Sequence, residues 1–316
     1  MIDNEVMAMK ITILAIPLLA LLLSGCSDDG ASEAVIHNEP AQTDNDSVSE
    51  PLPDEDEVRF TAVAAYFNRL TTDRYMLSED DINPADSGTW LIDLRNRDAF
   101  SEGSLPEAVS SDPASLGDVL GRLRQADHVV FISEDGQVAS QVMAATRMAG
   151  INSALLAGGI KEYEGDLQPG QRSISELVDT AEEAVGGDPE TQIMDEVVSR
   201  YLSGDIATDQ SRVSPATLHE NLSDYYIIDT RSEADYEEAH VPTAHHVPVA
   251  SIGQHMPDIP ADQPLLVYCY SGQTGAQVAT VLAIAGFETY TLKNGMGNWV
   301  EQGFETAQPD ADPVTK

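Results

Sequence analysis

The chain has 316 residues, a length that predicts about two domains, and its 42% hydrophobic content is ordinary for a globular protein. Its charge is not ordinary, because 54 Asp and Glu residues against 16 Lys and Arg residues give a formal net charge of −38. A surface this acidic repels nucleic acid and anionic lipid, so neither is an expected partner. The two cysteines, Cys26 and Cys269, are too few for a disulfide framework or a cysteine-rich metal site.

The N-terminus carries the pattern of an export signal. A mostly apolar run at residues 11–23 follows Lys10. The run is shorter than the about 20 residues that span a bilayer, and it fits the hydrophobic region of a signal peptide. It ends in Leu23-Ser24-Gly25-Cys26, which resembles the lipobox of bacterial lipoproteins. The resemblance implies removal of residues 1–25 and lipidation of Cys26; a secretory signal with a coincidental cysteine is the alternative.

Cys26 also sets the expected location of the protein. Two or more acyl chains hold a protein stably on a membrane, so we expect a lipid anchor in the cell envelope. Ser27 follows the cysteine, where by the same resemblance an Asp would favour the inner membrane. We therefore expect attachment to the outer membrane, facing the periplasm. Residues 26–57 are acidic and poor in large apolar side chains, which predicts a disordered tether.

After residue 57, one pattern occurs twice with a constant offset of 136 residues. Residues 91–95 match residues 227–231, and residues 129–132 match residues 265–268. A repeat of this length indicates a duplicated domain, because solenoid repeats are about 20–50 residues long. The predicted organisation is a signal peptide at 1–25, a tether at 26–57, a first domain at 58–166, a linker at 167–191, a second domain at 192–305 and a tail at 306–316.

Each copy has the pattern of an α/β domain. Residues 265–268 form an apolar run without polar alternation, as expected of a strand buried on both faces. Residues 276–285 predict a helix that Gly286 ends, and residues 287–292 predict the next strand. Within the linker, the sequence predicts a short helix at 174–184. Strands that alternate with helices indicate a mostly parallel sheet flanked by helices, so the predicted fold class is α/β, with two tandem domains.

The chemistry is expected at Cys269, where the predicted strand 265–268 ends and the next helix starts. Open parallel sheets place their sites at this carboxyl end of the strands. A tight loop there turns successive backbone N–H groups inward as an anion nest, and the helix N-terminus adds about half a positive charge. We therefore expect a thiolate at neutral pH, with the pKa of Cys269 lowered from about 8.5 to about 3.5–7.5.

Segments of the second copy together resemble the rhodanese (sulfurtransferase) family. They are residues 228–231 (IDTR), 239–244 (AHVPTA), 269–275 (CYSGQTG), 286–287 (GF) and 293–299 (KNGMGNW). The resemblance covers both copies, so it implies two tandem rhodanese-like domains. It also implies a sulfurtransferase in which Cys269 attacks the outer sulfur of thiosulfate or of a persulfide or polysulfide. The resulting persulfide then passes its sulfur to cyanide or to a thiol.

The resemblance assigns roles within the loop. Cys269 is the implied nucleophile, the side chains of Ser271 and Thr274 add hydrogen bonds, and neither a cofactor nor a metal is expected. Many family members carry an Arg in this loop, whereas here the nearest candidate cation is Lys293. We therefore expect weak use of thiosulfate and a less charged donor. The backbone N–H groups implied to bind the donor and the persulfide belong to Tyr270, Ser271, Gly272, Gln273, Thr274 and Gly275.

The equivalent loop of the first copy, residues 133–139, lacks a cysteine. Ser133 takes its place, and Glu134 and Asp135 follow it. A serine without a base is a weak nucleophile, and the two carboxylates oppose the binding of an anion. We expect this domain to be inactive and, by resemblance to tandem sulfurtransferases, to shape the entrance of the active half.

Other interpretations stay open. One alternative is that Cys269 is an inert buried thiol. Another is a non-catalytic sulfur- or partner-binding module of the envelope, which the missing loop cation and the degenerate first copy favour. Phosphatase chemistry needs an Arg six residues after the cysteine, where this chain has Gly275. Asp229 and Arg231 predict a structural ion pair, because the same pair recurs in the first copy. The histidines near His240 predict structural contacts rather than metal ligation.

Overall fold

The computed structural model describes residues 53–309, except 71–73, 180–186 and 207–209. Residues 1–52 lie outside the described residues, and with them the predicted signal peptide, Cys26 and most of the predicted tether. No helix in the described ranges combines the length and the apolar character that crossing a bilayer requires.

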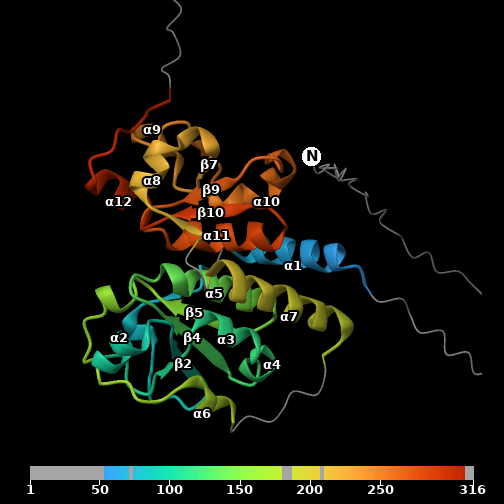
Figure 1. Cartoon of the computed structure of the whole chain (residues 1–316), viewed down its shortest axis with the longest axis vertical. Helices are drawn as coiled ribbons and strands as arrows, with labels where there is room; N and C mark the ends of the chain where they lie inside the picture. The colour runs from blue at the N-terminus through green and yellow to red at the C-terminus, as the bar shows by residue number, and fades with distance from the viewer. Residues whose placement is uncertain (1–52, 71–73, 180–186, 207–209, 310–316) are drawn as a thin grey trace, which may run out of the picture. The chain divides into compact units, whose positions relative to one another are not determined.

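The first half of the described chain is built on one parallel sheet with the strand order β1-β5-β4-β2-β3 (Figure 1). Its strands are β1 (Met76–Leu77), β2 (Thr89–Asp93), β3 (Val109–Ser110), β4 (His128–Ile132) and β5 (Ser153–Leu156). Its helices are α1 (Glu55–Leu70), α2 (Arg97–Glu102), α3 (Pro113–Gly117), α4 (Leu120–Leu123), α5 (Gln137–Met148) and α6 (Ile174–Val178), with the 3-10 turns η1 (Glu79–Asp81) and η2 (Ile160–Glu162).

The second half repeats this topology in the order β6-β10-β9-β7-β8 (Figure 1). Its strands are β6 (Arg212–Val213), β7 (Tyr226–Asp229), β8 (His245–His246), β9 (Leu265–Tyr268) and β10 (Thr289–Leu292). Its helices are α7 (Pro189–Tyr201), α8 (Pro215–Glu220), α9 (Glu233–Glu238), α10 (Ile252–His255), α11 (Gln273–Ile284) and α12 (Gly295–Glu301). Shorter turns are η3 (Leu202–Ile206), which is a π-helical continuation of α7, η4 (Leu222–Asp224), η5 (Val249–Ser251) and η6 (Met256–Asp258).

The predicted α/β fold with two tandem parallel-sheet domains is confirmed. Strand β9 has the predicted bounds, whereas β10 begins at Thr289, two residues later than predicted. Helix α11 begins at Gln273, three residues before the predicted start, because the loop residues that follow Gly272 already take helical geometry. Helix α6 ends at Val178, and the rest of the predicted helix falls mostly on residues outside the described ranges.

Two helices overlap the predicted boundaries. Helix α1 begins at Glu55, inside the predicted tether, and its first turn carries three acidic residues where they favour the positive end of the helix dipole. The predicted linker ends at residue 191, whereas α7 already begins at Pro189. Its N-cap is Asp188, whose side chain accepts a hydrogen bond from the Thr191 amide.

The helix that precedes each sheet covers the other half. Helix α1 packs against α10 and α11, and α7 packs against α3 and α5. Helices α5 and α11 also pack against each other (Figure 1). One apolar core cluster therefore contains residues of both halves, such as Phe67 and Met143 from the first and Val278 and Val281 from the second. Because the two halves share this core, residues of one half are positioned to reach the loops of the other.

Candidate active site

Cys269 directly follows β9, the central strand of the second sheet, and α11 begins four residues later. The residue is buried, with 4% of its surface exposed. The turn depends on Gly272, whose φ of 91° lies in the left-handed region. A Cβ at this position would lie 2.7 Å from Nε2 of Gln137 in the other half. Glycine therefore meets both the conformational and the packing demand.

Backbone amides surround the sulfur of Cys269. The N–H groups of Gly275, Gly272, Ser271 and Thr274 hydrogen-bond to it. These donors come from the loop and from the first turn of α11, so the loop geometry and the helix N-terminus act on the same atom. Four of the six amides that the sequence predicts to bind the donor, all except those of Tyr270 and Gln273, therefore contact the sulfur.

The ionisation state differs from the expectation. Burial raises the pKa of the Cys269 thiol above its ordinary value, and the amide hydrogen bonds lower it by less. Moving a charged thiolate away from water costs more than moving the neutral thiol, and here that cost exceeds what the amides return. This direction is the opposite of the lowered pKa that the loop sequence predicts for Cys269.

The start of α12, just after β10, forms backbone hydrogen bonds with the Cys269 loop. The amides of Met296 and Gly297 donate to the carbonyl oxygens of Cys269 and Tyr270, at 2.8 and 2.9 Å. Gly295 has a φ of 60°, and a Cβ there would lie 2.5 Å from the Cys269 carbonyl oxygen. The close approach of the two backbones thus requires glycine at this position.

Tyr270, the loop residue that follows Cys269, has an exposed aromatic side chain. Its residue is 52% exposed, and its hydroxyl donates to the carboxylate of Asp235 on α9. Hydrogen bonds from Ser232 and from Tyr270 lower the pKa of that carboxyl. The guanidinium carbon of Arg231 lies 5.7 Å from the centre of the Tyr270 ring. The phenol ring is therefore held in place rather than swinging freely.

The predicted structural ion pair beside the loop is present. Arg231 donates to Asp229 through Nε at 3.1 Å and through Nη2 at 2.7 Å, and both residues are buried. The Tyr268 hydroxyl donates to the same carboxylate at 2.7 Å, and Arg231 also donates to the Ala239 carbonyl. Because Asp229 neutralises the guanidinium inside the fold, this arginine serves the structure and adds little positive charge to the loop.

A cation that the sequence did not point to lies against the Cys269 loop. Nη1 of Arg74, from the segment before β1 in the first half, donates to the Thr274 hydroxyl at 3.4 Å. The Gln277 side chain donates to the Arg74 carbonyl at 3.0 Å, and the Tyr66 hydroxyl donates to Gln277 at 3.3 Å. Two side-chain hydrogen bonds thus connect α1 and α11 to the backbone that carries this guanidinium.

The family description "Rhodanese-like domain" matches residues 77–166 and 214–302, one copy in each half and more than half of the chain. The chain belongs to the rhodanese-like family. Thiosulfate sulfurtransferase GlpE of Coxiella burnetii is 36% identical over 77 residues, which are 24% of this chain and 72% of that protein. The protein YtwF of Bacillus subtilis is 29% identical over 90 residues, which are 28% of this chain and 87% of that protein.

Solved structures of the rhodanese-like family were also matched. A rhodanese-related protein from Thermoplasma volcanium is 20% identical with a TM-score of 0.30, covering 30% of this chain and 96% of that one. A thiosulfate sulfurtransferase from Pseudomonas aeruginosa is 19% identical with a TM-score of 0.29, covering 81% of this chain and 45% of that one.

Equivalent glutamines in the two rhodanese-like halves each contact the other half. Each glutamine lies in the first turn of its helix. Gln137 of α5 donates to the Leu292 carbonyl at 2.9 Å and accepts from the Asn294 amide at 3.1 Å. Gln273 of α11, offset by 136 residues, accepts from the Gly158 amide at 3.4 Å. The Gln273 side chain therefore contacts the other half, and donor binding by its backbone amide stays a prediction.

The rhodanese-like first half uses its serine as a structural acceptor. The Ala139 amide donates to the Ser133 hydroxyl at 3.2 Å, which is the equivalent of the Gly275 contact with Cys269. Glu134 lies 3.8 Å from Arg95, and Asp135 accepts from the Gln137 amide. Two carboxylates thus stand where the second half has Tyr270 and Ser271, and the inactivity of this half stays a prediction.

The remaining candidates contribute less. Lys293 lies at the end of β10 and donates its backbone amide to Val213, and in the described part of the chain its ammonium group makes no ion pair. Nδ1 of His240 lies 2.8 Å from the Tyr236 carbonyl oxygen, and its ring stacks on Tyr236. No three His, Cys, Asp or Glu side chains of the described ranges gather as metal ligands. Arg74 was missed because it lies 200 residues from Thr274 and belongs to no motif.

Proposed function

We propose that the protein is a sulfurtransferase that carries a sulfane sulfur as a persulfide on Cys269. The observation that carries this proposal is the set of four amides around the sulfur of a lone cysteine in a rhodanese-like half. Amides held in place before the reaction stabilise negative charge on the thiolate and on the outer sulfur of a persulfide. The match to thiosulfate sulfurtransferase GlpE over 77 residues supports the same chemistry.

The reaction has two displacement steps. The Cys269 sulfur attacks the outer sulfur of the donor, the donor S–S bond breaks, and with thiosulfate its electron pair leaves on sulfite. The thiol proton moves to the outer sulfur or to solvent. Cyanide or a thiolate then attacks that outer sulfur, the new S–S bond breaks, and Cys269 regains its electron pair while thiocyanate or a new persulfide leaves. Each step breaks one bond to sulfur and forms another, so no external oxidant is needed.

Arg74 supports a donor with an anionic end. Its guanidinium bonds Thr274, whose own amide bonds the reacting sulfur, so positive charge lies beside the nest. The weak use of thiosulfate expected from the loop sequence depended on the absence of a nearby cation. Because Arg74 lies near the loop, the proposed donors include thiosulfate as well as persulfide and polysulfide.

Sulfur loading tests the proposal. The full chain incubated with thiosulfate or polysulfide is expected to gain the mass of one sulfur atom, mapped to Cys269 by peptide mass spectrometry. Cys269→Ser removes the gain, and the matched variant Ser133→Ala at the equivalent position keeps it. Equal loading of Cys269→Ser, or the absence of loading with every donor, contradicts the proposal.

The alternative is a sulfur-binding or partner-binding module without useful turnover. The 4% exposure of Cys269 favours it, because a buried thiol is slow to meet an acceptor. Steady-state production of thiocyanate from thiosulfate and cyanide separates the two functions. Many turnovers per chain support the enzyme, and a single stoichiometric transfer supports the binding module.

We also propose that Cys26 carries a lipid anchor on the outer membrane, facing the periplasm. The motif Leu23-Ser24-Gly25-Cys26 after an apolar run supports this location. Fractionation of bacteria that express the full chain is expected to recover it with the outer membrane, and Cys26→Ser releases it into the soluble fraction. Equal membrane recovery of the variant contradicts the anchor.

A further inference from the structure

The side chains of Tyr270 and Asp235 lie beside the Cys269 loop and take no part in the two displacement steps. Tyr270 is 52% exposed, and its hydroxyl donates to Oδ2 of Asp235 on α9. The Ser232 hydroxyl donates to the same oxygen. An ionised carboxylate accepts hydrogen bonds at both of its oxygens. Among the described residues no donor bonds Oδ1 of Asp235, so this oxygen is left for a ligand.

Asp235 is negatively charged at neutral pH. Hydrogen bonds from Ser232 and Tyr270 lower the pKa of this carboxyl below its ordinary value. The guanidinium carbon of Arg231 lies 5.7 Å from the centre of the Tyr270 ring, but Arg231 is paired with Asp229 at 2.7 Å. Because that ion pair has no net charge, Asp235 adds a negative charge beside the loop that Arg231 does not balance.

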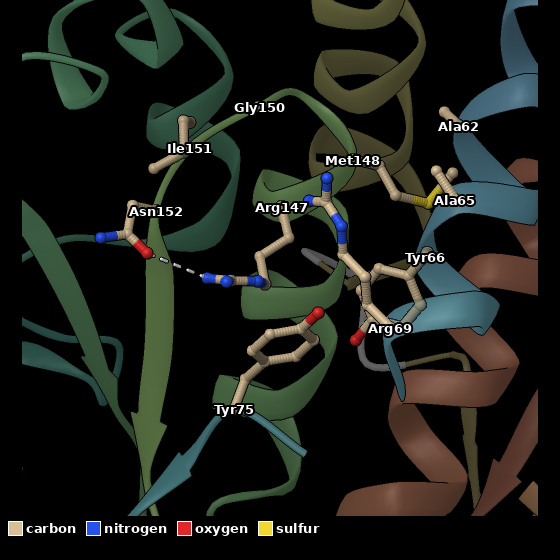
Figure 2. A pocket seen from close by; sticks show the side chains of 10 residues that line it. All are labelled: Ala62, Ala65, Tyr66, Arg69, Tyr75, Arg147, Met148, Gly150, Ile151 and Asn152. Carbon is tan, nitrogen blue, oxygen red and sulfur yellow. Dashed lines mark hydrogen bonds between the residues drawn. The ribbon is translucent and has the colours of Figure 1, made fainter. Parts of the chain in front are cut away.

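The other end of the loop carries the opposite charge. Arg74 is exposed and donates to Thr274, four residues after Tyr270. The residue that follows Arg74 holds its backbone in place, because Tyr75 is buried and its ring centre lies 3.7 Å from the guanidinium carbon of Arg147 (Figure 2). The loop thus has a cation near one end and a carboxylate near the other, which suits a donor and an acceptor of different charge.

The first half lacks the pair of Tyr270 and Asp235. At the offset of 136 residues, Tyr270 corresponds to Glu134 and Asp235 corresponds to Ala99. Helices α2 and α9 have the same bounds at this offset, so the first half builds the same helix with a methyl group in place of the carboxylate. The fold therefore does not require Asp235, which is present in the half that carries the cysteine.

Burial and charge restrict the acceptor in different ways. Cys269 is 4% exposed, so a small molecule reaches a sulfur bound there more easily than the surface of a folded protein does. A carboxylate beside the loop attracts a cationic acceptor and repels an anionic one, and the net charge of −38 acts in the same direction. The acceptor that fits both restrictions is a small thiol with a positive charge.

We propose that the sulfur acceptor is a small aminothiol whose ammonium group binds Asp235; this assignment rests on the proposed persulfide at Cys269. The thiolate of the aminothiol attacks the outer sulfur, the S–S bond to Cys269 breaks, and its electron pair returns to the Cys269 sulfur. The aminothiol leaves as its persulfide, and its thiol proton passes to Cys269 or to solvent. A new S–S bond forms as the old one breaks, so no oxidant is needed.

Transfer from pre-loaded protein tests this acceptor. The full chain is loaded from thiosulfate, freed of excess donor and mixed with cysteamine, 2-mercaptoethanol or 3-mercaptopropionate, which end in an ammonium, a hydroxyl and a carboxylate. Mass spectrometry of the Cys269 peptide follows the loss of the added sulfur, and each rate constant is expressed per thiolate. We expect the rate constant for cysteamine to exceed that for 2-mercaptoethanol about fivefold, as for an exposed ion pair, and 3-mercaptopropionate to be slowest.

Asp235→Asn is expected to bring the ratio of the cysteamine and 2-mercaptoethanol rate constants to within a factor of about two of unity, because it removes the charge. Glu237→Gln is the matched control and is expected to keep the wild-type ratio. It removes a charge from an exposed residue of the same helix, and residues two positions apart on a helix do not share a face. A purely structural role for Asp235 would change all three rate constants alike and leave the ratio as it is.

Three results overturn the acceptor assignment: equal wild-type rate constants for the three thiols, an unchanged ratio in Asp235→Asn, or the same fall in Glu237→Gln. Circular dichroism checks each fold, and Asp235→Ala, with the residue found at Ala99 in the first half, replaces Asp235→Asn if that variant unfolds. Absence of loading with every donor overturns the sulfurtransferase function together with its acceptor. Normal loading followed by equal transfer to the three thiols overturns the acceptor alone.

Discussion

The guanidinium of Arg74 in the first half donates a hydrogen bond to the hydroxyl of Thr274 in the second half, at 3.4 Å. Thr274 also directs its backbone amide at the Cys269 sulfur. The half without a cysteine thus places positive charge beside the loop of the half that has one. The equivalent position in the second half is Gln210, so the first-half loop receives no such charge from it.

Arg74→Gln is expected to lower kcat/KM for thiosulfate by about tenfold, which corresponds to about 1.4 kcal/mol at an exposed charge. Arg74→Lys keeps the charge and restores part of the activity. Turnover of an uncharged sulfane donor such as an organic trisulfide stays within a factor of about two in both variants, because it makes no use of the cation. An equal fall with both donors would show that Arg74 acts only through the structure of the loop.

The titration of Cys269 provides a second prediction. Burial raises the pKa of this thiol above its ordinary value, so the folded protein holds the proton that the unfolded chain releases at lower pH. The rate of alkylation by iodoacetamide is therefore expected to keep rising as pH increases past about 8.5, the ordinary thiol value. By the same linkage, the free energy of unfolding falls as pH rises above that value. A plateau in the alkylation rate at neutral pH would restore the thiolate expected from the loop sequence.

Alanine substitutions at Gly295 and Gly303 distinguish the cost of backbone strain from the cost of a steric collision. Both have positive φ, but a Cβ at Gly295 would lie 2.5 Å from the Cys269 carbonyl oxygen, whereas nothing lies within 4 Å of one at Gly303. Gly303→Ala is expected to cost about 1–2 kcal/mol in the free energy of unfolding, the cost of the left-handed conformation alone. Gly295→Ala adds the collision and is expected to exceed about 3 kcal/mol in chemical denaturation. A similar loss in the free energy of unfolding for the two variants would mean that the backbone around Gly295 shifts to relieve the collision at no energetic cost.

Gln137→Ala is expected to destabilise the joined halves by about 2–6 kcal/mol. The fully buried side chain satisfies the Leu292 carbonyl and the Asn294 amide, and each buried group left without a partner costs about 1–3 kcal/mol. Gln302→Ala, on the exposed end of α12, is the control and is expected to stay within about 0.5 kcal/mol of wild type. Urea unfolding measures both variants. A shift of less than about 1 kcal/mol for Gln137→Ala contradicts a structural role for this contact.

The strands and the loop were readable from the sequence because their signals are local. A short apolar run such as residues 265–268 is typical of a strand buried on both faces, and β9 has those bounds. The glycines at 272 and 275 and the following helix pattern predicted the nest, and the amides of these residues do bond Cys269. Helix α1 was missed because its first residues are acidic and resemble a tether, and its apolar side chains find their partners only on α10 and α11.

The sequence by itself determined the duplicated α/β fold, the position of Cys269 at the end of a central strand and the amides that ring its sulfur. These follow from contacts between residues close in the chain. Only the tertiary structure decided the ionisation of that thiol and the charge beside it, because both depend on distant segments. Burial in the fold outweighs the amides and raises the pKa of Cys269, and the packing of α1 on the second half brings Arg74 to a loop 200 residues away.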